Sequence, residues 1–289
     1  MKLLVLICLL AAEFARAGTL AQFRTVFGEI DVELYDSQKP VTVRNFKALV
    51  ESGAYENTFF QRVQPGFVAQ GGGFYIINPF STNFFGPPWS LLGQVPGFGN
   101  ITNEFGVGPK FSNTNGTIAM AKLGGDPNSA STEWFFNLAD NSANLDNQNG
   151  GFTVFGHVLG GTNAVLQLFN SISYFNGLQP MQAWYPNDPL ATNVFTYLPV
   201  QYIGVAPPRY VDLVYVNITL LGVRVSSAGN QQQISWNSVA GRTNFVEYTT
   251  VMPPIWKPLV ATNGTGARFT ATDQAPTNTF RFYRVRVGY

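Results

Sequence analysis

Residues 59–74 read FFQRVQPGFVAQGGGF, and this stretch decides the fold. Pro65 and Gly66 form a pair that favours a tight turn, and the apolar, β-prone runs on both sides predict strand, turn, strand. One cation, Arg62, stands among the apolar side chains, and a glycine triplet follows the turn. That triplet is a weak lookalike of a phosphate-binding loop. Because it lacks a lysine and a following helix, it predicts a tight turn instead.

The flanking sequence predicts further strands and two amphipathic helices. Residues 21–35 alternate apolar and polar side chains on both sides of Gly28, a pattern typical of a hairpin. Residues 40–52 begin with a proline and gather apolar side chains on one face, which predicts a helix. A shorter helix is expected over residues 162–170. Further strands are expected over residues 116–121, 133–137 and 210–221.

Two long segments interrupt this pattern. Residues 75–112 are rich in Gly, Pro, Phe and Asn without a clear period, which predicts a long surface loop. Residues 171–209 are rich in proline and predict a second irregular insertion. After residue 222, short apolar runs separated by polar turns predict about five or six strands. Residues 222–289 are therefore expected to form a separate small β module.

The N-terminus has the pattern of an export signal. Lys2 precedes an apolar run over residues 3–12, and Ala15-Arg16-Ala17 is a small-x-small cleavage site. The run is shorter than the about 20 apolar residues that a membrane span needs; a buried first strand or a membrane anchor is the alternative. We expect residues 1–17 to be a signal peptide and the mature protein to be secreted or periplasmic.

Composition excludes several kinds of partner and site. Only 11% of the residues are charged and the net charge is +1, so no strong field attracts nucleic acid or acidic lipid. Signal removal takes away Cys8, the only cysteine, which leaves no thiol nucleophile and no disulfide. The only histidine, His157, is interpreted as a structural or exposed residue. We expect no cofactor, no metal, no nucleic acid and no membrane span, and we expect a monomer.

Three blocks resemble signature segments of the cyclophilin-type peptidyl-prolyl cis-trans isomerases. The first is residues 59–74, where the family pattern is F-x-R-V-x-P-G-F-x-x-Q-G-G-x-F. The second is NTNGTIAMA at residues 113–121 with SASTEWFFN at residues 129–137. The third is Leu145-Asp146 followed by Val154-Phe155-Gly156. The blocks occur in the order that the family has.

The resemblance covers residues 18–221 and implies the fold of that domain. We expect a mainly β protein whose first domain is a closed antiparallel β-barrel of about eight strands capped by two helices. Residues 222–289 resemble fibronectin type III-like or related small β domains of bacterial secreted proteins. A small β-sandwich-like module with an adhesive or spacer role is expected there. Carbohydrate binding and a structural extension packed on the barrel are the alternatives.

The reaction that the resemblance implies, isomerisation of an X-Pro bond, makes and breaks no covalent bond. Amide resonance sets a barrier of about 18–20 kcal/mol, and uncatalysed exchange takes roughly tens to hundreds of seconds. A catalyst has to favour the twisted amide, in which the prolyl nitrogen becomes pyramidal and its lone pair is free. A guanidinium aimed at that nitrogen stabilises the twisted amide more than the planar one. An apolar pocket around the ring keeps water from competing for this donor.

The resemblance also implies the residues of the site. Arg62 is the guanidinium donor, Gln70 positions it and binds the substrate backbone, and Phe67 is part of the pocket that holds the proline. The other residues implied for the substrate surface are Val68, Ala121, Lys122, Glu133, Phe135, Leu145 and Phe152. Among them, Ala121 and Lys122 belong to a segment that binds the peptide through its backbone. The alternatives are that Arg62 is a surface arginine in a salt bridge, that the apolar residues are ordinary barrel core, and that the Lys122 side chain is solvated.

Three positions depart from the family pattern. Glu133 stands where glutamine is usual, so it could pair with Arg62 or repel acidic peptides. Asn144 replaces an aromatic residue of many members, which puts binding of macrolide-type inhibitors in doubt. Phe152 replaces a histidine, and its ring still closes the pocket.

We expect an isomerase that acts on proline-containing peptides or exported proteins, with reduced or altered activity. The alternative is a non-catalytic secreted peptide-binding or surface scaffold protein, in which the two insertions cover Arg62.

Overall fold

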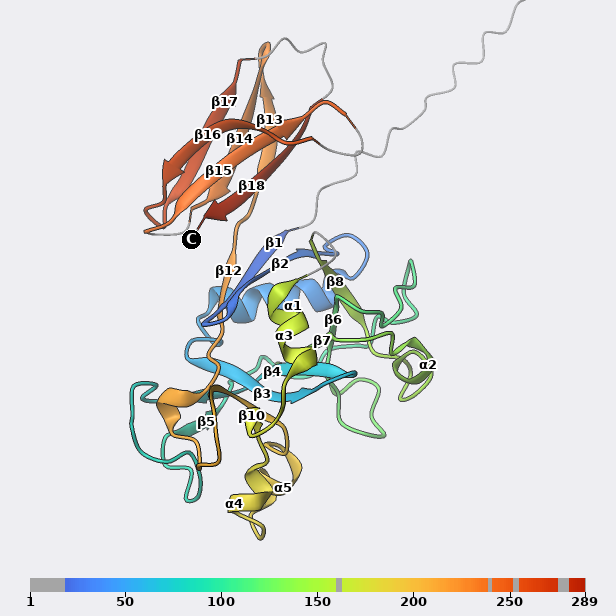
Figure 1. Cartoon of the computed structure of the whole chain (residues 1–289). Coiled ribbons are helices and arrows are strands. Elements are labelled where there is room, and N and C mark those ends of the chain that lie inside the picture. The colour runs from blue at the N-terminus through green and yellow to red at the C-terminus, as the bar shows by residue number, and fades with distance from the viewer. Residues whose placement is uncertain (1–18, 160–162, 239–240, 252–254, 275–280, 289) are drawn as a thin grey trace, which may run out of the picture.

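The three-dimensional structure is a computed structural model that describes residues 19–159, 163–238, 241–251, 255–274 and 281–288. The expected signal peptide and the first residue of the helix expected over 162–170 lie outside this description. A large curled sheet forms the centre of the molecule, and strands of the C-terminal module lie beyond one end of it (Figure 1). The strands of the central sheet are β1 (Leu20–Thr25), β2 (Gly28–Leu34), β3 (Thr58–Gln64), β4 (Val68–Ile76), β5 (Leu92–Gln94), β6 (Thr117–Met120), β7 (Trp134–Asn137), β8 (Val154–Val158) and β12 (Asn217–Leu220).

This antiparallel sheet curls into a barrel. Its strands follow the order β12-β1-β2-β8-β6-β7-β4-β3, and β5 pairs with β4. The two ends of the path meet through the residues just before β12. The Phe60 amide donates to the Val214 carbonyl at 3.0 Å, and the Val216 amide donates to the Thr58 carbonyl at 2.9 Å. An irregular link therefore closes the barrel between β12 and β3.

The strand expected over residues 210–221 is wrong in its first half. Residues Tyr210–Asp212 form a single turn of 3-10 helix (η1), and the regular strand begins only at Asn217. The reason is burial: Tyr210 is 2% exposed and Leu213 is fully buried, both in a core outside the barrel. The chain has to turn there to place these side chains before it joins the barrel.

Two helices cover the ends of the barrel, as expected. Helix α1 (Pro40–Glu51) buries Phe46 and Leu49 in the barrel core. Its first amides, those of Val41 and Thr42, donate to the Glu104 carboxylate at 3.1 and 2.7 Å, which supplies the cap that a helix start needs. Helix α3 (Ala164–Ser171) is capped by the Asn163 side chain.

The two segments expected to be irregular build a lobe with its own aromatic core, which we call the accessory lobe. Phe85 from the first segment packs edge-on against Phe195 from the second, with ring centroids 5.0 Å apart, and both rings are fully buried. The expectation of plain loops is wrong because apolar residues far apart in sequence bury one another, which leaves no local period. Besides β5 and η1, its elements are β9 (Ser173–Tyr174), β10 (Asn176–Gln179), α4 (Met181–Trp184), α5 (Pro189–Asn193) and β11 (Leu198–Ile203).

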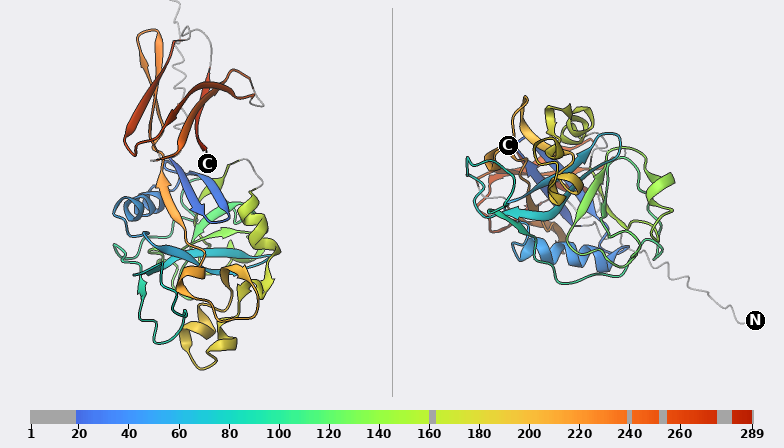
Figure 2. Two further views of the ribbon diagram at one scale, coloured as in Figure 1. Left: turned by 60° about the vertical axis from the view of Figure 1, so that its left-hand side comes forward. Right: turned by 90° about the horizontal axis from the view of Figure 1, so that it is seen from below.

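The C-terminal module consists of two small sheets with a shared core. Their orders are β13-β14-β17 and β16-β15-β18, and Ile234, Trp236 and Val246 lie buried between them. The strands are β13 (Arg224–Ala228), β14 (Gln231–Asn237), β15 (Thr243–Thr249), β16 (Lys257–Asn263), β17 (Arg268–Asp273) and β18 (Phe282–Gly288). Figure 2 shows this module and the accessory lobe at opposite ends of the barrel.

The expected fold class is confirmed: the protein is mainly β, with a curled antiparallel barrel sheet, few helices and additional C-terminal sheets. Among the described residues, no helix has the length and apolar character to cross a membrane.

Candidate active site

An apolar cluster lies on the outer face of the barrel, separate from the barrel core. Because successive residues of a strand point to opposite faces, Phe135 faces this cluster while its neighbours Trp134 and Phe136 face the core. The buried members are Val68, Ala119, Phe135, Leu145 and Val154, and the half-buried side chains packed on them are Tyr35, Phe67, Phe111, Ala121 and Phe152. All the apolar side chains expected around the proline thus lie together, and we call this set the apolar cluster.

Arg62 stands at the edge of the apolar cluster. It is the cross-strand partner of Gln70 in the pairing of β3 with β4. The guanidinium lies over the Phe67 ring, 5.9 Å from its centroid, and donates to the Gln64 side chain. Burial lowers the pKa of Arg62, and the nearby Tyr197 opposes this shift; an arginine keeps its charge in proteins all the same. The ion pairs of the described residues include none of Arg62.

Glu133 is held by two glutamines instead of by Arg62. Its Oε2 accepts from Gln70 Nε2 at 2.5 Å and from Gln61 Nε2 at 2.9 Å. Burial raises the pKa of the Glu133 carboxyl, and the two amide donors oppose the shift. Gln70 therefore binds Glu133, whereas the guanidinium of its cross-strand partner Arg62 donates to Gln64.

The glycine triplet makes room for this polar network. Gly72 has a φ of 80°, a left-handed conformation that favours glycine. A Cβ atom on Gly73 would lie 2.6 Å from Gln61 Oε1 and 2.8 Å from Glu133 Oε1. The Gly73 amide donates to that same Gln61 oxygen at 2.9 Å. The triplet lies inside β4, so the tight turn expected there is wrong; its glycines instead allow close packing of the site.

Ala121 and Lys122 border the apolar cluster on the side of β6. The Ala121 amide donates to the Glu133 carbonyl at 2.9 Å, which ties this segment to the strand that carries Phe135. The Lys122 side chain is half-buried and not free in solvent: Nζ donates to the backbone carbonyls of Asn149 and Gly151 and lies over the Phe152 ring.

Two aromatic residues of the apolar cluster were missed by sequence reasoning. The rings of Tyr35 and Phe111 stack with centroids 4.1 Å apart, and both pack against the apolar cluster. His157 also stacks on Tyr35, with ring centroids 5.6 Å apart, so the only histidine has a structural contact. Phe111 lies at the end of the segment interpreted as a loop. Its position directly before the NTNGTIAMA block is the signal that could have identified it.

The accessory lobe does not share its core with the apolar cluster. Of the two long segments, only the first supplies a residue to the apolar cluster, namely Phe111. The second comes near Arg62 at Tyr197, whose carbonyl accepts from the Val63 amide at 2.8 Å and whose side chain opposes the lowering of the Arg62 pKa. In Figure 1, α4 and α5 lie below the barrel, whereas α2 (Ser142–Leu145), which carries Leu145 of the apolar cluster, lies to its right. Asn144 is exposed on α2 and accepts from the Gln148 amide at 2.6 Å.

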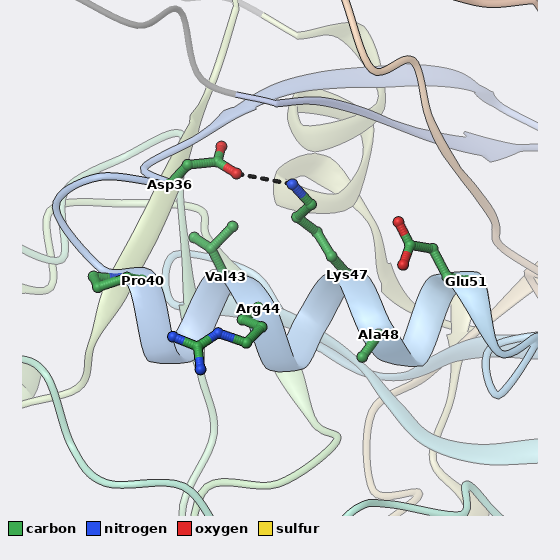
Figure 3. Close-up of a pocket in the computed structure, with 7 residues that line it drawn as sticks. All are labelled: Asp36, Pro40, Val43, Arg44, Lys47, Ala48 and Glu51. Atoms are coloured by element: carbon green, nitrogen blue, oxygen red, sulfur yellow. Dashed lines mark hydrogen bonds and ion pairs between the residues drawn. The ribbon is translucent and has the colours of Figure 1, made fainter. Parts of the chain in front are cut away.

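A second surface hollow lies on helix α1, outside the apolar cluster. Figure 3 shows its lining, in which Asp36 and Lys47 form an ion pair of 2.9 Å. The other lining residues are Pro40, Val43, Arg44, Ala48 and Glu51. This mixture of opposite charges on one helix face has the features of an ordinary solvated surface. Within the described ranges, no group of three or more His, Cys, Asp or Glu side chains could hold a metal ion.

Comparisons with known proteins point to one family. The family model for cyclophilin type peptidyl-prolyl cis-trans isomerases matches residues 20–182. A peptidyl-prolyl cis-trans isomerase of Acinetobacter baylyi is 35% identical over 163 residues, which cover 56% of this chain and 78% of that protein. Peptidyl-prolyl cis-trans isomerase B of Escherichia coli is 34% identical over 150 residues, 50% of this chain and 81% of that protein. A crystal structure of a cyclophilin type isomerase from Cryptosporidium parvum aligns with 70% of this chain and 98% of its own, with a TM-score of 0.44 and 20% identity.

Proposed function

Because this chain belongs to the cyclophilin-type peptidyl-prolyl cis-trans isomerase family and is itself such an isomerase, we propose how its own residues perform the reaction and where. Arg62 is the donor that stabilises the twisted amide, and the apolar cluster binds the proline ring. The observation that carries this proposal is the position of Arg62: a half-buried cation stands directly beside an apolar surface made of Phe67, Phe135 and Phe152.

The proline ring binds against the apolar cluster. Phe135 is 4% exposed and forms the floor, while Phe67 and Phe152 are half-buried and present ring surface at its edges. The rings of Phe135 and Phe152 meet edge to face with centroids 5.9 Å apart, a stable arrangement for aromatic pairs. Such walls exclude water from the prolyl nitrogen, so Arg62 does not compete with solvent for it.

Arg62 then acts on the nitrogen as the amide twists. In the planar amide the nitrogen lone pair is delocalised and accepts poorly; in the twisted amide it is free to accept a hydrogen bond. The contact with Phe67 and the bond to Gln64 hold the guanidinium in place before the substrate arrives. A preorganised donor of this kind contributes more in the transition state than in the ground state, which is the condition for catalysis.

A protease-coupled assay on a chromogenic X-Pro peptide tests the proposal. The wild-type protein is expected to accelerate cis–trans exchange, and the Arg62→Ala variant is expected to lose about 100-fold or more of that activity, the usual effect of removing one such donor. Lys47→Met is a suitable control, since Lys47 pairs with Asp36 on helix α1. An Arg62→Ala variant that is folded and as fast as the wild type would refute the role of Arg62.

We further propose that the substrates are exported proteins. The support is the N-terminal pattern: Lys2, the apolar run over residues 3–12, and Ala15-Arg16-Ala17. Expression of the full sequence in a Gram-negative host followed by fractionation tests the proposal. A periplasmic or secreted product that begins at Gly18 is expected. A cytosolic product with Met1 or Lys2 at its N-terminus would contradict it.

A further inference from the structure

Lys122 makes three contacts with the loop that carries Phe152. Its Nζ donates to the Asn149 carbonyl at 2.7 Å and to the Gly151 carbonyl at 2.6 Å. The same atom lies 4.6 Å from the centroid of the Phe152 ring, within the range of a cation–π interaction. One ammonium group therefore binds both the backbone and the aromatic side chain of this loop.

Other bonds fix the backbone of this loop. Gly150 and Gly151 both have a φ of 73°, a conformation in which side-chain-bearing residues are strained. The Asn103 amide donates to the carbonyls of Gly150 at 2.9 Å and Gly151 at 3.1 Å. The Asn113 amide donates to the Phe152 carbonyl at 3.0 Å, and the Phe152 amide donates to the Leu145 carbonyl at 3.0 Å. These bonds hold the backbone. On the ring itself, Phe135 contacts Phe152 edge to face, and Lys122 places a cation over the ring face.

The charge of Lys122 is retained in this position. Burial lowers the pKa of its ammonium, and Asp126 opposes that shift. Two carbonyl oxygens and the electron-rich face of the ring take the place of the water that the ammonium loses. Lys122 is half-buried, so its aliphatic stem lies along the protein surface while its head is occupied by the loop.

We propose that Lys122 is a positioning residue that locks the Phe152 ring as a wall of the proline-binding surface, and thereby sets the affinity for the prolyl residue. The inference rests on the proposed function, in which the apolar cluster binds proline. It adds a side-chain role to Lys122, for which the family resemblance implied contacts through the backbone alone. The contribution is to binding: the wall contacts the proline ring equally in the planar and in the twisted amide. Loss of Lys122 should therefore raise KM and leave kcat almost unchanged.

A double-mutant cycle on the full chain tests this. Lys122→Met keeps the length and apolar stem of the side chain and removes the ammonium. We expect KM for an X-Pro peptide to rise about tenfold, with kcat within twofold of wild type. In a Phe152→Leu background, the same substitution should change KM by less than about threefold, because the ring on which Lys122 acts is gone. Lys122→Arg, which keeps a cation over the ring, should recover most of the affinity.

The outcomes separate the inference from its premise. If Lys122→Met is folded and has wild-type KM, or if its effect is equally large in the Phe152→Leu background, the positioning role is refuted. A fall in kcat with constant KM would also refute it, because Lys122 would then act on the reacting amide. Failure of the proposed function would give another result: Arg62→Ala would be as active as the wild type, independently of the KM of the Lys122 variants. Thermal unfolding of every variant, with Lys47→Met as the matched lysine control, identifies effects on folding.

Discussion

The half-buried carboxylate of Glu133 gives the most specific prediction about substrate choice. Glu133→Gln removes the negative charge and keeps the shape, and a glutamine oxygen can still accept from both Gln61 and Gln70. The carboxylate reaches the cross-strand partner of Arg62 through one hydrogen bond of 2.5 Å. Because the proposed function places the prolyl nitrogen at Arg62, it also brings the residues next to the proline near this carboxylate. A substrate with an acidic residue beside its proline should be disfavoured by the wild-type protein.

The magnitude follows from Coulomb's law. Two unit charges about 10 Å apart, at an effective dielectric constant of about 40, interact by about 0.8 kcal/mol. That energy corresponds to about a fourfold change in kcat/KM. We therefore expect wild-type protein to prefer a Gln-Pro over a Glu-Pro peptide about fourfold at low salt, and Glu133→Gln to show no preference. At about 0.01 M ionic strength the Debye length is about 30 Å, so screening is small there.

The same charge predicts a pH dependence. Burial raises the pKa of Glu133 above its usual value, so the carboxyl gains its proton earlier than other glutamates as the pH falls. The preference of the wild type for Gln-Pro over Glu-Pro should therefore fade at acidic pH. The glutamate of the peptide also gains a proton there, so the wild type is compared with Glu133→Gln at each pH, and the variant should show no such change. Since the folded pKa is raised, the charged form of Glu133 lowers stability once the pH rises past that pKa. Glu133→Gln should accordingly be at least as stable as wild type at neutral pH.

Coupled isomerisation assays on matched Glu-Pro, Gln-Pro and Lys-Pro peptides, at two ionic strengths, measure these ratios. Glu51→Gln is the matched control, because Glu51 lies on helix α1 away from the apolar cluster. An unchanged Gln-Pro to Glu-Pro ratio in Glu133→Gln at low salt would show that the carboxylate does not act on the substrate.

Three further predictions concern the pocket floor, the cap of α1 and the C-terminal module. Phe135→Ala should lower stability by about 3–5 kcal/mol and abolish most activity, measured by urea unfolding and by kcat/KM; Phe135→Leu should retain more of both. Glu104→Ala should destabilise by about 3–5 kcal/mol, because two helix amides lose their acceptor and the buried Lys39 loses a nearby negative charge. Glu104→Gln should cost about half as much; an equal loss in both variants would contradict the capping role. A chain that ends at Gly222 should keep kcat/KM within about twofold of the full chain, since β12 completes the barrel at Leu220; a large loss would mean that the module contributes to the site.

Sequence patterns predict the elements of the fold that are determined by neighbouring residues in the chain. The hairpin on both sides of Gly28 and the helix that begins at Pro40 follow from alternation, from a turn residue and from a helix start, and the structure has all of them. The strands that carry Arg62 and Phe135 were likewise expected, because their apolar residues are contiguous in the sequence.

The accessory lobe could not be predicted in this way. Phe85 and Phe195 are 110 positions apart by their numbering and bury each other, so neither segment shows a period of its own. The same limit applies to Tyr35 and Phe111, which join the apolar cluster from a strand end and a loop end. The bonds of Lys122 to Asn149 and Gly151 depend on a loop conformation that no sequence pattern shows. Glu133 departs from the family pattern, yet its bond to Gln61 depends on the sheet, in which β4 lies between the strand of Gln61 and the strand that follows Glu133.

The most direct test of the central claim compares kcat and peptide affinity in Arg62→Lys and Arg62→Ala. If the guanidinium acts on the twisted amide, both variants should bind an X-Pro peptide within about threefold of the wild-type Kd, as measured by NMR titration. Exchange spectroscopy on the same samples should then show a kcat about 100-fold or more below wild type for alanine, with lysine in between. A loss confined to Kd, with kcat unchanged, would contradict the claim that Arg62 stabilises the transition state.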